Sequence, residues 1–97
     1  MSFAQALTED RRLVILRFLS EAPGYSANDS MLADCLRSIG HNPSRDQVRG
    51  DIAWLAEQGL LTVDEIASIM LATVTERGGD CAAGRVIVPG VKRPSPR

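Results

Sequence analysis

The sequence predicts a mainly helical α+β fold, in which three helices precede a small β-hairpin and a fourth helix follows it. Apolar residues recur at helical spacing in three segments before residue 59. β-Branched and apolar residues replace that pattern between residues 61 and 74. Glycine or proline separates the segments, as expected at helix ends. The chain has 97 residues, of which 44% are hydrophobic, so we expect one domain with a modest core.

The first helix is expected to begin at Thr8, whose side chain is a good N-cap. The two acidic residues that follow suit the positive end of the helix dipole. Apolar residues between 13 and 19 form its buried face, and Ala22-Pro23-Gly24 ends it near Glu21. A very short strand is predicted at Tyr25-Ser26.

The second and third helices carry clear end signals. Asn28 is the predicted N-cap of the second helix, and Gly40 is its stop. A turn at 41–43 leads to Ser44, which caps a third helix over about residues 44–58. Gln47 lies three residues after Ser44, as a capping box requires.

The strand pattern predicts a hairpin of residues 61–63 and 69–74 with its tip near Ala67-Ser68. Thr75 is expected to cap a fourth helix that runs through about Ala83. A short apolar segment follows at 86–88. Residues 1–88 are therefore predicted to form the domain, and residues 89–97, which are basic and rich in proline, an extended tail.

This order of elements is that of a winged helix-turn-helix. The stretch Ser44–Val63 resembles the recognition helix and first wing strand of ArsR-type and MarR-type regulators, and Val74–Gly78 is similar to the segment that opens the next helix in them. The whole chain resembles small winged-helix proteins encoded by Mu-like prophages, notably at 8–13, 21–25, 44–60 and 88–97. The resemblance implies a DNA-binding fold, and thus a regulator of phage or prophage genes.

With Val48, Ile52 and Leu55 buried, the third helix exposes Arg45 and Arg49 near its N-terminal end. Arginine at this place can bind guanine or a phosphate in the major groove. The complete candidate set for double-stranded DNA is Ser44, Arg45, Gln47, Arg49, Gly50, Lys92 and Arg93.

Each candidate also has a simpler interpretation. In that interpretation, Ser44 and Gln47 only cap the third helix. The basic tail then either improves solubility or docks on a protein partner. The arginines are then solvated surface residues, with Arg49 paired to Asp46 or Asp51.

The predicted wing favours a different function class. It carries Asp64 and Glu65 and no basic residue, and carboxylates beside phosphates repel them. The formal net charge of −1 also departs from the basic character of most nucleic-acid binders. The alternative is a winged-helix module for protein interaction or assembly. Trp54 belongs either to the core or to a partner surface.

No pattern indicates an enzyme, a cofactor or a metal site. Cys35 and Cys81 are far apart, and His41 is the single histidine, so neither a clustered ligand set nor a catalytic base is visible. No export signal or membrane span is apparent, and we expect a cytoplasmic protein. The small size favours a homodimer, for which the first helix, the fourth helix and residues 86–88 are the expected contacts.

Overall fold

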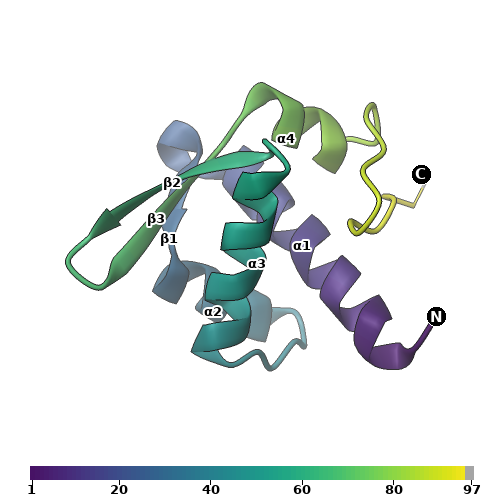
Figure 1. Cartoon of the computed structure of the whole chain (residues 1–97), viewed down its shortest axis with the longest axis horizontal. Coiled ribbons are helices and arrows are strands. Elements are labelled where there is room, and N and C mark those ends of the chain that lie inside the picture. Colours follow the sequence, from purple (N-terminus) through teal and green to yellow (C-terminus); the bar gives the residue numbers. More distant parts are fainter. Residues whose placement is uncertain (96–97) are drawn as a thin grey trace.

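The computed structural model describes residues 1–95 and has an α+β architecture compatible with a winged-helix fold (Figure 1). Four α-helices pack beside a small antiparallel sheet of three strands, whose β2–β3 hairpin projects to one side. The helices are α1 (Phe3–Glu21), α2 (Asp29–Ser38), α3 (Arg45–Glu57) and α4 (Glu76–Ala82), and the strands are β1 (Ser26–Asn28), β2 (Leu61–Ile66) and β3 (Ile69–Val74). A 3₁₀ turn at Pro23–Tyr25 joins α1 to β1.

Helix α1 begins six residues earlier than predicted. Ser2 is its N-cap, and the Ser2 hydroxyl accepts a hydrogen bond of 3.1 Å from the backbone N–H of Gln5. Thr8 lies inside the helix, where its hydroxyl donates to the carbonyl oxygen of Ala4. The prediction of Thr8 as the cap was wrong because Ser2 offers the same chemistry and residues 3–7 are compatible with helix. The predicted end at Glu21 is confirmed.

The other three predicted N-caps are confirmed. The side chain of Asn28 caps α2, that of Ser44 caps α3 and that of Thr75 caps α4. Ser44 and Gln47 form both hydrogen bonds of the capping box, at 3.1 and 3.0 Å. These local bonds fix where each helix starts.

The sheet has the strand order β1-β3-β2. Ile66 lies opposite Ile69, so the hairpin turns through Ala67 and Ser68 as predicted. Ala67 adopts a φ of 56°, the left-handed conformation that a turn without asparagine or glycine must still reach. Strand β1 pairs with β3 at residues 26–28, so it starts one residue later and ends two residues later than the predicted Tyr25-Ser26 strand.

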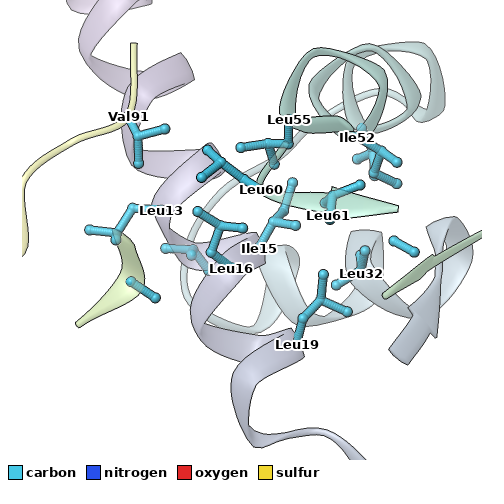
Figure 2. Packing of buried hydrophobic residues seen from close by; sticks show 14 of the residues in the cluster. Leu13, Ile15, Leu16, Leu19, Leu32, Ile52, Leu55, Leu60, Leu61 and Val91 are labelled. Carbon is cyan, nitrogen blue, oxygen red and sulfur yellow. The ribbon is translucent and has the colours of Figure 1, made fainter. Parts of the chain in front are cut away.

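Leucine and isoleucine side chains from α1, α2, α3 and β2 form the core (Figure 2). Eleven large side chains have less than 2% of their surface exposed, among them Leu16, Leu36 and Leu55. Burial of each such side chain stabilises the fold by about 1.5–3 kcal/mol. This core holds α3 by one face only, so its opposite face reaches solvent.

The part of the chain that packs on the domain extends beyond residue 88, the predicted end of the domain. Val88 and Val91 are 4% and 6% exposed, and Figure 2 shows Val91 beside α1. The backbone N–H of Lys92 donates to the carbonyl of Glu9, and the Arg12 guanidinium donates to the carbonyl of Gly90. Residues 89–92 of the predicted tail therefore pack against α1, with Val91 as the buried anchor. Arg97 lies outside the described residues.

Candidate nucleic-acid interface

The N-terminal half of α3 carries the predicted DNA-binding residues on its exposed side. The Arg45 side chain is 66% exposed and that of Arg49 is 28% exposed. No atom lies within 4 Å of where a Cβ on Gly50 would be, so the surface beside it is open. Ser44 and Gln47 bind each other through the capping box. Two of the predicted residues are therefore engaged in starting the helix.

Arg49 joins three elements. Its Nη1 atom donates to Asp29 Oδ2 at 2.7 Å and to the Ser68 carbonyl oxygen at 3.0 Å. Its Nη2 atom lies 3.3 Å from Glu65 Oε1. Arg49 thus connects α3 both to the first residue of α2 and to the tip of the β2–β3 hairpin. The alternative pairing of Arg49 with an acidic residue of α3 was wrong.

Arg45 lies over the same hairpin tip but stays open to solvent. Its Nη2 atom donates to the Ser68 carbonyl oxygen at 2.9 Å, and its Nε atom lies 3.8 Å from Asp29 Oδ2. A guanidinium has five N–H donors, so Arg45 keeps donors for a ligand while these contacts orient its side chain.

Asp29 is the residue that the sequence did not single out. Its side chain is 3% exposed and accepts a hydrogen bond from the Ser30 N–H at 3.0 Å. Burial raises the pKa of Asp29, but the bonds from Arg49 and Ser30 and the charges of Arg49 and Arg45 outweigh it and lower the pKa. The carboxylate is therefore charged at neutral pH and holds both arginines. The one feature of the sequence that could have drawn attention to Asp29 is its place directly after the Asn28 cap, as an acidic residue in the first turn of α2.

Carboxylates crowd this surface. Asp46 and Glu65 are exposed, Glu65 lies 3.3 Å from Arg49, and the buried Asp29 lies within 4 Å of both arginines. Asp64 is also exposed, but it is next to Glu65 on β2, where successive side chains point to opposite faces. The positive charges of α3 are thus offset locally, and the electrostatic attraction for a polyanion is smaller than the two arginines alone suggest.

The basic tail residues belong to a separate cluster. Lys92 Nζ lies 3.5 Å from Asp10 Oδ1 on α1, and Asp10 Oδ2 is 2.7 Å from His41 Nε2. Arg93 is exposed beside Lys92. In Figure 1 the C-terminal segment and the hairpin lie at opposite ends of the view. The structure therefore does not bring Lys92 and Arg93 together with the arginines of α3.

The remaining candidate chemistry is sparse. Within residues 1–95, no group of three or more His, Cys, Asp or Glu side chains is placed to hold a metal ion. Cys81 is buried and Cys35 is half-buried, and both are free thiols. No helix in the same range is both long enough and apolar enough to cross a membrane.

Over 91 residues the chain is 58% identical to gp26 of Escherichia phage Mu, and the match covers 94% of each chain. The chain belongs to the family of phage Mu gp26. A second relative, from Haemophilus influenzae, is 49% identical over 83 residues, which are 84% of this chain and 80% of the relative. Both are described as uncharacterized proteins, so membership of the gp26 family supports a Mu-like phage origin and names no activity. No family profile matches the chain, and no solved structure does.

Proposed function

We propose that this protein is a winged-helix DNA-binding protein that regulates phage or prophage genes, with α3 in the major groove and the β2–β3 hairpin as the wing. The observation that supports it best is the position of Arg45. This side chain is exposed at the N-terminal end of α3, and its contacts with the Ser68 carbonyl and the Asp29 carboxylate orient it. An arginine held in this way reads guanine with little loss of side-chain entropy.

The surface beside Arg45 favours close contact with a duplex. Gly50 and Ala53 are exposed on the same helix and carry little or no side chain. The backbone of α3 can therefore approach base edges closely. In this proposal Ser44 and Gln47 hold the helix start, where a phosphate is favourable. Lys92 and Arg93 add sequence-independent attraction to the DNA backbone.

The test is fluorescence anisotropy of labelled duplexes rich in G·C or in A·T pairs, titrated from about 50 to 200 mM salt. Wild type is expected to bind with a steep salt dependence and to favour guanine-rich duplexes. Arg45→Ala is expected to reduce that preference roughly 10–100-fold, the effect of one bidentate guanine contact. Arg37→Ala is the matched control, because Arg37 is an exposed arginine of α2 paired with Asp34. Wild type that does not bind at micromolar concentration in low salt would refute the proposal.

The second candidate is a protein-interaction or assembly module without DNA contact. The exposed carboxylates Asp46 of α3 and Asp64 and Glu65 of the hairpin favour it, since a major-groove surface usually carries an excess of positive charge. In this reading the hairpin and α3 present an acidic surface to a protein. Absence of DNA binding together with retained fold in the anisotropy experiment would favour this candidate.

We further propose that the protein acts as a cytoplasmic homodimer and needs no cofactor. Helices α1 and α4 remain the expected contacts. The segment 86–88 was expected to contribute because it is apolar. Val88 is buried in the core of its own protomer and Val86 packs against that core, whereas Ile87 is 60% exposed, so Ile87 is the residue of this segment that remains available for the contact.

A further inference from the structure

A groove runs between the C-terminal half of α1 and helix α4. It is a depression of about 420 Å³, lined by apolar Val14, Phe18 and Ile39, with Arg17 and Glu21 among its polar residues. A second depression adjoins it and shares Ser20, Gly79 and Ala83. Ile39 is 52% exposed there. The groove is therefore an apolar surface that the described chain leaves uncovered.

Gly79 of α4 keeps the groove clear, and the fold of one chain does not explain it. A Cβ on the neighbouring Gly78 would lie 1.9 Å from the carbonyl oxygen of Leu60, so the fold requires glycine there. A Cβ on Gly79 would meet no atom within 4 Å. Glycine inside a helix costs about 1 kcal/mol relative to alanine. What Gly79 provides is room for a second surface to approach the helix.

The charges on α1 indicate which surface that is. Arg17 and Glu21 are one helical turn apart and both exposed, yet neither forms an ion pair with any residue between 1 and 95. When two copies of α1 cross antiparallel about a two-fold axis, Arg17 of each copy faces Glu21 of the other. The pattern is self-complementary, so a second copy of this chain satisfies it twice.

We propose that the occupant of this groove is the C-terminal half of α1 from a second copy, packed antiparallel against α1 and α4. The half-buried Phe18 then becomes covered, Gly79 allows close approach, and two symmetric pairs between Arg17 and Glu21 set the register. This inference deepens the homodimer part of the proposed function and is independent of whether the protein binds DNA.

Charge reversal tests the pairing directly by sedimentation equilibrium over a range of protein concentrations. Wild type is expected to dimerise. Arg17→Glu alone and Glu21→Arg alone place like charges opposite each other, and we expect each to raise the dimer dissociation constant about tenfold or more. The double variant, and an equimolar mixture of the two single variants, restore opposite charges and are expected to dimerise again. Arg37→Glu, a reversal on α2, controls for the change in net charge.

A size series at the groove floor gives a second test. In Gly79→Leu the added Cβ meets no atom of its own chain within 4 Å, so the fold, measured by circular dichroism, is expected to persist while the longer side chain, which reaches into the groove, abolishes the dimer. Gly79→Ala adds one methyl group and is expected to have a smaller effect. A wild type that is monomeric throughout, or single charge reversals that dimerise as tightly as wild type, would overturn the inference. Neither result measures the contact of Arg45 with DNA, which Arg45→Ala tests with the dimer intact, so failure of one proposal can be told from failure of the other.

Discussion

Asp51 of α3 is the charge whose removal is expected to damage the fold most. Its Oδ2 atom lies 2.7 Å from Arg11 Nε and its Oδ1 atom 3.5 Å from Arg12 Nε, while the Asp51 side chain is 5% exposed and that of Arg11 10%. Arg12 Nε has no hydrogen-bond partner, so its attraction to Asp51 is electrostatic only. One carboxylate therefore compensates two guanidinium groups that are largely removed from water.

The expected cost of Asp51→Asn follows from that burial. Charges about 4 Å apart attract by about 4 kcal/mol at an effective dielectric constant near 20. Removing one partner of a buried pair leaves the other charge uncompensated and costs about 3–5 kcal/mol. Total stability of a domain is about 5–15 kcal/mol, so the loss is a large fraction of it. For a chain of this size it lowers Tm by at least about 12 °C.

Urea unfolding followed by circular dichroism measures this loss, with Asp34→Asn as the matched control. Asp34 pairs with Arg37 at 3.0 Å, but the two side chains are 68% and 49% exposed. An exposed pair contributes about 0–1 kcal/mol, so the control variant is expected to unfold close to wild type. Equal unfolding midpoints for the two variants would refute the burial argument, since both remove one carboxylate from one ion pair.

Three further outcomes are expected. Gly78→Ala destabilises the fold by about 1–3 kcal/mol or more, since its Cβ meets the rigid Leu60 carbonyl; unchanged urea unfolding contradicts this. Because the pKa of Asp29 is lowered in the folded protein, its contribution to stability is present above the unfolded pKa near 4 and is lost as pH falls through the folded value. The free energy of unfolding of Asp29→Asn should then vary less with pH in the acid range than that of wild type. Equal slopes of unfolding free energy against pH for the two proteins would rule this out. In Gly90→Ala the Cβ would lie 2.6 Å from the Trp54 ring, so the C-terminal segment lifts off and fluorescence of the single tryptophan shifts to the red; an unshifted spectrum argues against that packing.

Local signals explain why most of the elements could be predicted from the sequence. The caps at Asn28, Ser44 and Thr75 act within three residues, and the hairpin tip follows from the strand pattern on each side of Ala67-Ser68. The start of α1 shows the limit of such signals. Two hydroxyl residues, at 2 and 8, offer the same cap, and the sequence alone does not decide between them.

Contacts between distant residues could not be predicted in the same way. Arg49 was recognised as exposed and basic, but its partners lie 20 and 16 residues away on α2 and β2. The pair of Arg11 and Asp51 spans 40 residues. Periodicity gives the face on which a side chain lies but not the element that packs against it. Hence the location of Arg45 and Arg49 near the start of α3 could be predicted from the sequence, whereas the carboxylates that contact them could not.

The two proposed surfaces depend on each other in one measurable respect. Asp29 lies within 4 Å of both arginines of α3 and Glu65 lies 3.3 Å from Arg49, so we expect one copy to bind DNA weakly. Linking two binding surfaces raises affinity by roughly 10²–10⁴-fold when both can engage one duplex. Arg17→Glu lies on α1, away from α3, and should nevertheless weaken DNA binding by breaking the dimer, whereas Arg45→Ala should weaken binding with the dimer intact. Mixing Arg17→Glu with Glu21→Arg should restore both dimer and DNA affinity. If Arg17→Glu forms monomers that bind DNA as tightly as wild type, each α3 acts alone and the dimer has another purpose.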